Sequence, residues 1–375
     1  MRAHVVLCLL LAVILSSVRF SRAQSDAFSD PANAGASLGE IARETRQHHL
    51  EMSAKGGQSR KVLEIVEELQ TSTEDEYVDK IGTLLAKSDF QGLEDAADRA
   101  RSSRSRFPGG AWRLFIFYDT IGRPAQGHAA SDLDWQQHID KLKQWTIVSP
   151  HSVTAHIALA QAYLSYGWKA RGSGFATTVS EEGWQQFGGR ADLAASELKL
   201  AAQSHEKCPY WYLAMMQLAL AQGWSKSTTT TLVEQSISFE PGFYHVYREF
   251  AVYLEPKWYG RPGEAEAFAE WISRKLGGEE GKFVYFEIAS VLNCNCRESS
   301  QMANLSWTKI QEGYSALEHL YGTSKLKMNR FAFMSYLAGD RAAAQPIFRE
   351  IGDSWDQETW RSKRKFDTAR DWAVQ

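Results

Sequence analysis

Apolar residues recur every three or four positions along most of the chain from Lys61 onward, and polar residues fill the positions between them. The segments VLEIVEEL, YVDKIGTLLAK and FQGLEDAADRA show this spacing. Residues three or four apart share one face of an α-helix, so each segment predicts a helix with one apolar side. The chain shows no convincing alternation of apolar and polar residues, the pattern of a half-buried strand. The pattern therefore predicts an all-α protein.

The predicted helices come in consecutive pairs. Pro150, Pro209 and Pro241 each stand where a helix is expected to open, a position that proline tolerates well. The interval from Pro209 to Pro241 is close to the ~34 residues of a tetratricopeptide repeat, and it holds a helix, a short turn and a second helix. Two further pairs are expected over 243–278 and 283–322, with the glycines at 277 and 278 capping the helix before them.

The segment RFAFMSYLAGDRAAAQPIFREIG (330–352) resembles a tetratricopeptide repeat more closely than the other pairs do. Ala332 is the small residue of its first helix, Gly339 and Asp340 form the turn, and Ala344 and Phe348 belong to its second helix. Small residues let two helices approach closely, and an aromatic ring fills the groove beside them. We therefore expect an α-solenoid of degenerate tetratricopeptide-like helix pairs, each of which buries its apolar face against its neighbours.

The N-terminus has the layout of a secretory signal peptide. Arg2 precedes the apolar run VVLCLLLAVIL, and the polar stretch after it ends in Ser21-Arg22-Ala23. That run is shorter than the ~20 apolar residues that span a bilayer, and no later segment is long and apolar enough to span one. We expect residues 1–23 to be a cleaved signal peptide, 24–58 a flexible leader and 59–375 the helical-repeat domain. The expected location is a periplasm or the outside of the cell.

Cleavage of the signal peptide would remove Cys8 and leave Cys208, Cys294 and Cys296 in an oxidising compartment. A structural role is favoured for these residues, either as buried thiols or in a disulfide that includes Cys208 and whose pairing the sequence does not give. A reactive pair formed by Cys294 and Cys296 is the alternative. A structural zinc site needs four ligands, and no second cysteine pair or histidine cluster completes one. We therefore expect no metal and no other cofactor.

The net charge and the absence of catalytic motifs argue against nucleic-acid binding and against the common enzyme classes. A net charge of -3 and a pI near 6.4 provide no general positive field for nucleic acid. The chain lacks HExxH, GxSxG, a P-loop and a complete GxGxxG, which favours a protein without catalytic activity. The arginines between 99 and 106 are interpreted as cations gathered at the C-terminus of a helix, where the helix dipole favours them.

Three segments together resemble an uncharacterised bacterial family that carries a domain of unknown function with a tetratricopeptide-like helical fold. They are WKARGSGFATTVSEEGWQQFGGR (168–190), CPYWYLAMMQLALAQGW (208–224) and EPGFYHVYREFAVYLEPKWYGRPGEAEAFA (240–269). SRSRFPGGAWRLFIFYDTI (103–121) looks like the N-terminal part of that family, and the resemblance covers about residues 85–275. It implies a fold and no established reaction.

Tryptophan and tyrosine beside lysine and arginine mark the candidate contact residues, a mixture enriched at binding hot spots. The first candidate is the loop with Trp168, Lys169, Arg171, Trp184 and Arg190, and the second is the turn with Trp258, Tyr259 and Arg261. The same residues can also hold a corner between helices through cation–π contacts. The leading hypothesis is a scaffold that binds a protein or peptide. The alternatives are an enzyme with an unrecognised site in the 168–190 loop and a glycan-binding protein.

Overall fold

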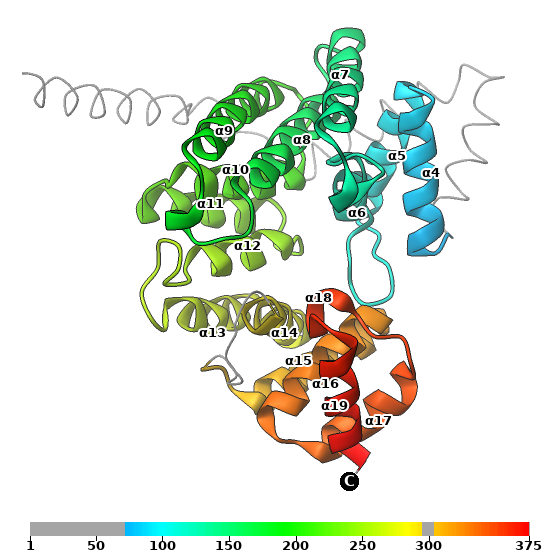
Figure 1. Ribbon diagram of the computed structural model, residues 1–375, viewed down its shortest axis with the longest axis vertical. Helices are drawn as coiled ribbons and strands as arrows, with labels where there is room; N and C mark the ends of the chain where they lie inside the picture. The colour runs from blue at the N-terminus through cyan, green and yellow to red at the C-terminus, as the bar shows by residue number, and fades with distance from the viewer. Residues whose placement is uncertain (1–71, 295–303, 375) are drawn as a thin grey trace, which may run out of the picture. The chain divides into compact units, whose positions relative to one another are not determined.

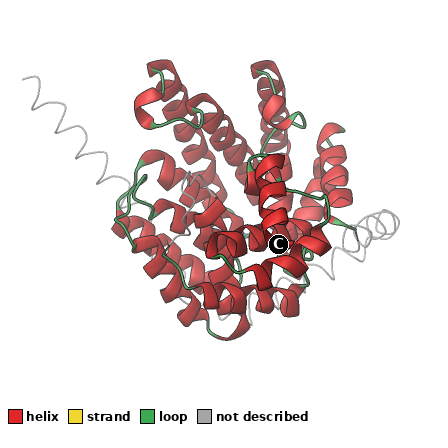
Figure 2. Cartoon of the chain, turned by 60° about the horizontal axis from the view of Figure 1, so that its bottom comes forward, coloured by secondary structure: helices red, strands yellow, loops and turns green. Residues whose placement is uncertain are grey.

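The computed structural model of the protein describes residues 72–294 and 304–374. These residues form α-helices joined by turns and two short 3₁₀ helices, and no strand lies among them (Figures 1 and 2). The α-helices are α4 (Glu74–Ala86), α5 (Phe90–Ser103), α6 (Arg113–Ile121), α7 (Asp132–Val148), α8 (Val153–Arg171), α9 (Glu181–Ala202), α10 (Pro209–Gln222), α11 (Lys226–Phe239), α12 (His245–Tyr253), α13 (Glu264–Leu276), α14 (Gly278–Cys294), α15 (Trp307–Tyr321), α16 (Lys325–Ala338), α17 (Arg341–Ile351), α18 (Gln357–Trp360) and α19 (Lys363–Val374).

The predicted all-α class is confirmed, and most predicted pairs lie where the sequence placed them. Gly277 caps α13 with φ 67°, and Gly339 ends α16 with φ 71°, both in backbone conformations that favour glycine. Pro209 is the first residue of α10. The expectation for Pro150 and Pro241 was wrong in detail, because these prolines lie in the turns that precede α8 and α12. The predicted signal peptide and leader lie outside the described residues.

Side-chain caps explain where several helices begin. The hydroxyl of Thr73 accepts a hydrogen bond from the Glu76 backbone, and the Glu76 carboxylate accepts one from the Thr73 backbone. Ser131 and Asp134 form the same reciprocal pair at the start of α7. Each pair provides acceptors for two backbone N–H groups at the start of the helix that have no partner within it, and it stabilises the helix by about 1 kcal/mol.

Helix packing follows the order of the chain. α6 contacts α8, α8 contacts α10, α10 contacts α12, α12 contacts α14 and α14 contacts α16. The helices between them, α7, α9, α11, α13, α15 and α17, each pack against one or both of their neighbours in this row. α8 has buried residues on every side because it is covered by α7, α9, α10 and α6. The core is therefore one continuous set of buried side chains that runs along the helices.

The last predicted pair has the packing that its small residues suggest. Ala332 and Ala344 are fully buried in α16 and α17, and Phe348 is buried beside them. Asp340 caps α17 through the backbone N–H of Ala343 and also accepts a hydrogen bond from the indole of Trp307 at 2.9 Å. The turn thus joins its own pair to α15.

The segment 104–112, here called the strap, connects parts of the chain that are far apart in sequence. The N–H of Gly109 donates to the carbonyl of Gly322 at 3.1 Å. The guanidinium of Arg106 and the indole of Trp112 both donate to the carbonyl of Gly242 at 3.0 Å. The Arg106 guanidinium also lies within 6 Å of the centres of four aromatic rings. These rings belong to Trp112, Tyr244, Phe283 and Tyr321.

The strap corrects part of the sequence interpretation. α5 ends at Ser103, so Arg99 and Arg101 lie in or near its last turn, as expected. Arg104 is the C-cap residue of α5, as expected, whereas Arg106 lies beyond the helix, where the helix dipole does not explain it. Arg104 pairs with Glu240 at 2.8 Å, and the Arg106 guanidinium is enclosed by aromatic rings.

Candidate functional site

Arg171, the last residue of α8, lies among three tryptophans. Its guanidinium carbon is 5.5 Å from the ring centre of Trp168, 5.4 Å from that of Trp184 and 5.3 Å from that of Trp258. Trp168 and Trp258 also meet edge to face, with their centres 5.6 Å apart. The two candidate segments of the sequence therefore meet at one place, which we call the Arg171 cluster.

The end of α8 fixes the position of the arginine. Gly172 caps the helix with φ 71°, and the chain turns away from the helix axis there. Arg171 Nη1 donates to the carbonyls of Gly172 at 3.0 Å and Gly174 at 3.1 Å, so the side chain holds the loop that follows its own helix. Trp168 lies one turn earlier on α8 and packs edge to face on the buried ring of Phe187. The cluster is thus anchored to α8 and α9.

The turn over 251–271 is a structural corner that also reaches the cluster. The Tyr259 hydroxyl donates to the carbonyl of Leu220 at 3.1 Å, and its ring stacks on Tyr253. Burial raises the pKa of Tyr259, and the neighbouring Tyr253 adds to the rise. A Cβ on Gly260 would lie 1.7 Å from the carbonyl oxygen of Leu254, so only glycine fits there. Trp258, from the same turn, lies with its ring centre 5.3 Å from the Arg171 guanidinium carbon.

The cluster is rigid on the inside and exposed at its edge. Trp184 is 40% exposed, Tyr259 is 41% exposed and Phe175, on the loop that Arg171 holds, is 80% exposed. Phe175 was not among the candidate residues, because a lone phenylalanine between glycine and alanine gives no signal in the sequence. Among the described residues no carboxylate forms an ion pair with Arg171, and the buried indole nitrogen of half-buried Trp258 has no hydrogen-bond partner. Within the described residues, the guanidinium of Arg171 contacts ring faces and backbone carbonyls.

The structure places the other three candidate residues outside the cluster. Lys169 forms an ion pair with Asp132 at 2.7 Å. Arg190 lies 3.3 Å from the ring centre of Tyr166 and donates to the carbonyl of the same residue at 2.8 Å. These contacts join α7, α8 and α9 and are structural. Arg261 is exposed, and its backbone N–H donates to a side-chain oxygen of Glu264 at 2.9 Å.

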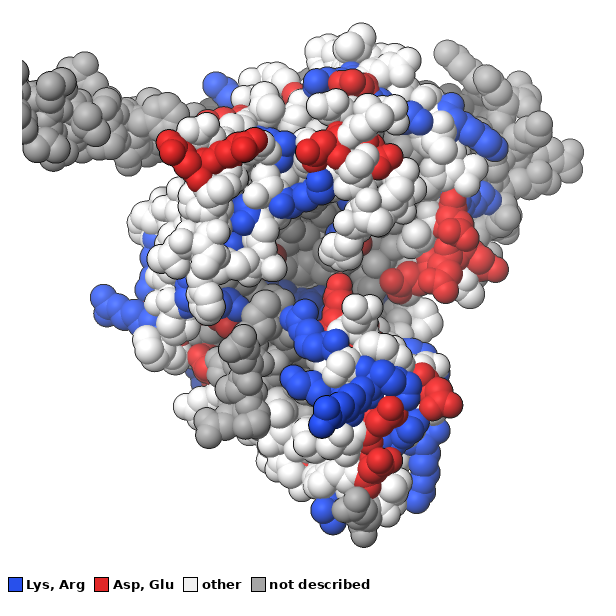
Figure 3. Space-filling model, in the orientation of Figure 1, with Lys and Arg blue, Asp and Glu red and all other residues white. Residues whose placement is uncertain are grey.

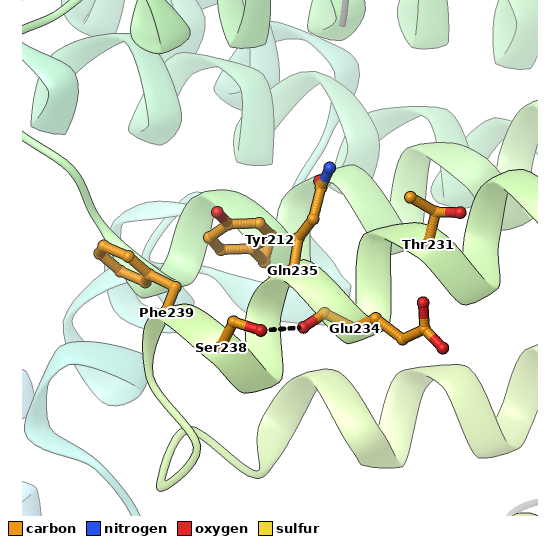
Figure 4. A pocket seen from close by; sticks show the side chains of 6 residues that line it. All are labelled: Tyr212, Thr231, Glu234, Gln235, Ser238 and Phe239. Atoms are coloured by element: carbon orange, nitrogen blue, oxygen red, sulfur yellow. Dashed lines mark hydrogen bonds between the residues drawn. The ribbon is translucent and has the colours of Figure 1, made fainter. Parts of the chain in front are cut away.

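Two hollows lie elsewhere on the described surface. One, of about 430 Å³, is a shallow groove on α10 and α11 (Figure 4). Within this groove, the Ser238 hydroxyl donates a hydrogen bond to the backbone carbonyl of Glu234 at 2.9 Å. The other, of about 550 Å³, lies between the strap and the end of α15. The first is lined by Tyr212, Thr231, Glu234, Gln235, Ser238 and Phe239, and the second by Arg104, Arg106, Phe107, Pro108, Leu320 and Tyr321.

Of the three cysteines expected in the mature chain, the structure describes the side chain of Cys208 alone. Cys208 is a buried free thiol, 3.7 Å from the hydroxyl of Tyr118. This matches the first of the two roles expected for it. Cys296 lies outside the described residues, and the pairing of Cys294 and Cys296 stays open. Within 72–294 and 304–374, no three His, Cys, Asp or Glu side chains gather in a way that could hold a metal ion.

Searches of protein-family models, of curated protein sequences and of solved structures found no match to this chain. The family resemblance noted from the sequence therefore stays a prediction. Among the described helices, none combines the length and the apolar character needed to cross a membrane.

Proposed function

We propose that this chain is an exported, tetratricopeptide-like α-solenoid that binds a peptide or protein segment, and that the Arg171 cluster is a contact site. The sequence supports export through its N-terminal pattern and supports the solenoid through its consecutive helix pairs. The sequential packing of α6 to α17 agrees with that interpretation. The observation that carries the binding proposal is one guanidinium held among three indoles with exposed aromatic rings at the edge.

The cluster has the physical properties of a binding hot spot. Its inner rings are held by helix contacts, so little conformational entropy is lost when a partner docks. Exposed Phe175 and Trp184 supply apolar contact area, and the Arg171 guanidinium, without a carboxylate partner in the described chain, can donate to a carbonyl or carboxylate of the partner. A segment with one apolar side chain next to an acceptor group would satisfy both.

The enzyme alternative placed its site in the 168–190 loop. The loop residues from Gly172 to Thr178 are all exposed. The loop therefore supports binding better than catalysis. Glycan binding is supported only by the groove on α10 and α11, where the rings of Tyr212 and Phe239 lie beside hydroxyl, amide and carboxylate groups (Figure 4).

Affinity capture tests the proposal. The mature chain, residues 24–375, is used to capture partners from an envelope extract of its source, and the segment cross-linked to it is then made as a synthetic peptide. A Phe175→Ala/Trp184→Ala variant should bind that peptide at least tenfold more weakly. The matched control is Leu133→Ala/Ile147→Ala, which removes apolar side chains that are 62% and 78% exposed on α7.

Equal binding by both variants would refute a contact role for the cluster. Binding lost only on Tyr212→Ala, and competed by oligosaccharides, would support the glycan alternative. Circular dichroism of each variant confirms that the helices are retained.

A further inference from the structure

His156, near the start of α8, lies between two hydrogen-bond acceptors. Its Nδ1 is 2.6 Å from a carboxylate oxygen of Glu197 on α9, and its Nε2 is 3.1 Å from the backbone carbonyl oxygen of Pro150, in the turn before α8. His156 is 5% exposed, and the Glu197 side chain is 19% exposed. The ring therefore joins the turn between α7 and α8 to the second half of α9 (Figure 1). We call these three residues the His156 clamp.

The two contacts determine how many protons the clamp must hold. A neutral imidazole has one N–H and one lone pair, so it can donate to only one acceptor. A backbone carbonyl can only accept a hydrogen bond, and so can an ionised carboxylate. Both contacts are therefore satisfied only when the clamp holds one further proton. That proton gives either an imidazolium beside a carboxylate or a neutral ring beside a protonated carboxyl group.

Two glutamates act on the ring, Glu197 from α9 and Glu94 from α5. Burial opposes the charged form of the ring, but the hydrogen bonds to Glu197 and Pro150 and the charges of the two glutamates raise the pKa of His156 above its usual value. Other titratable groups lie close by. Asp98 on α5 acts on Glu94, Tyr163 on α8 interacts with Glu197 and with Asp140 on α7, and His151 in the same turn is exposed.

The clamp is screened less than exposed charges are. Figure 3 shows Lys, Arg, Asp and Glu side chains spread over the face of the molecule that it draws, where water and salt weaken the interactions between them. Buried charges interact more strongly because little water lies between them. One proton at the clamp should therefore matter more to the fold than one proton on an exposed group.

Loss of the further proton breaks one of the two contacts. The remaining N–H stays on the contact with Glu197, which is the shorter one and has a charged acceptor. The lone pair of Nε2 then faces the Pro150 carbonyl oxygen, and two acceptors at 3.1 Å repel each other. The start of α8 has its own cap, because the Ser152 hydroxyl accepts a hydrogen bond from the Ala155 N–H at 2.9 Å. The turn at Pro150 is therefore the part that deprotonation should release.

We propose that the His156 clamp is a pH-sensitive switch, which fastens the turn before α8 to α9 when it is protonated and releases the Pro150 carbonyl when it is not. The switch is separate from the Arg171 cluster and does not depend on peptide binding there. Because the folded state holds the proton more tightly than the unfolded chain does, the clamp stabilises the protein fully below the unfolded histidine pKa of about 6.5. This stabilisation is lost as the pH rises through the higher folded pKa.

Nuclear magnetic resonance of the mature chain, labelled with ¹⁵N-histidine, tests the proposal. His156→Gln identifies the signals of His156 among those of the other histidines. We expect both of its ring nitrogens to carry protons at pH 6 and to titrate above pH 6.5. Glu197→Gln should weaken proton binding to the ring about tenfold or more, because it removes the charged acceptor. The control is Glu182→Gln, which removes an exposed carboxylate from the same helix and should leave the titration unchanged.

Hydrogen–deuterium exchange measures the release of the turn. After correction for the intrinsic effect of pH on exchange, the protection of residues 149–156 should fall as His156 loses its proton, while that of α10 stays constant. Three results would overturn the proposal: a His156 titration at or below pH 6.5, the same titration in Glu197→Gln, or constant protection of the turn. If Glu197→Gln loses its helical circular-dichroism spectrum, the titration and the turn protection of the wild type decide alone.

Discussion

Glu249 on α12 should make the protein more stable in mild acid than in mild base. Burial raises the pKa of this carboxyl from 4.5 to about 7, although the neighbouring Arg248 lowers it. The folded state therefore holds the proton more tightly than the unfolded chain does. The stabilisation is complete below the unfolded pKa and is lost as the pH rises through the folded value near 7.

The size of the effect follows from the two pKa values. A rise from 4.5 to about 7 corresponds to about 3 kcal/mol between the protonated and ionised forms. Glu249 is only half-buried, so water screens part of this energy, and about 1–3 kcal/mol is expected in practice. Glu249→Gln keeps the shape and removes the titration. At pH 8 the variant should be more stable than the wild type by that amount, and at pH 4.5 the two should be nearly equal.

Urea denaturation followed by circular dichroism at pH 4.5, 6, 7 and 8 measures the free energy of unfolding of both proteins. The difference between them should grow with pH and level off near pH 8. Glu182→Gln, an exposed change on α9, is the control for replacing a glutamate by glutamine. A difference between wild type and Glu249→Gln that is constant across this pH range would refute the argument that burial controls this carboxyl.

Three further changes test other parts of the structure in the same urea assay. Gly260→Ala should lower the free energy of unfolding by about 2–4 kcal/mol, because the added Cβ would meet the backbone of Leu254. Gly188→Ala, which has open space around it in α9, should raise the free energy of unfolding by about 0.5–1 kcal/mol. Equal effects of the two changes would contradict the steric explanation. Lys327→Met should lower the free energy of unfolding by about 3–5 kcal/mol, because it leaves the buried carboxylate of Glu287 without its partner. The double variant Lys327→Met/Glu287→Leu should regain most of that stability. If it does not, the stability of this region does not depend on the ion pair. Arg106→Ala should cost about 2–3 kcal/mol, and a cost below 0.5 kcal/mol would show that the strap does not need it.

The helical class and most element positions follow from local sequence. The spacing of apolar residues, the glycine caps at 277 and 339 and the helix start at Pro209 are short-range signals, and they depend on backbone geometry that each helix establishes for itself. The prediction that Pro150 and Pro241 begin helices was wrong because proline is equally compatible with the turn before a helix and with the first residue of the helix.

The candidate site was only partly predictable. The sequence named Trp168, Arg171, Trp184 and Trp258 as aromatic and basic residues of two separate segments. Nothing in the local sequence shows that these two segments meet at Arg171. Lys169 lies beside Trp168 in the sequence, as a candidate contact residue would, but its ammonium forms an ion pair with Asp132 on α7 instead of joining the cluster.

The buried charged group formed by Arg248, Glu287 and Lys327 gave no sequence signal either. Its members are single charged residues on three amphipathic helices, where charged residues usually face solvent. Their burial depends on how α12, α14 and α16 pack, and that information is distributed over all three helices.

The strap has a consequence for how the protein unfolds. A chain whose helix pairs touch only their neighbours can lose terminal pairs one at a time, because each pair contributes its own share of stability. The hydrogen bonds from Arg106 to a carbonyl 136 residues away, and from Gly109 to Gly322, close long loops across several pairs. Breaking them exposes both partners at once, so opening of the strap is coupled to opening near Gly242 and Gly322. The strap thus links helix pairs that are distant in sequence, at the cost of slower folding because such contacts need long loops to close.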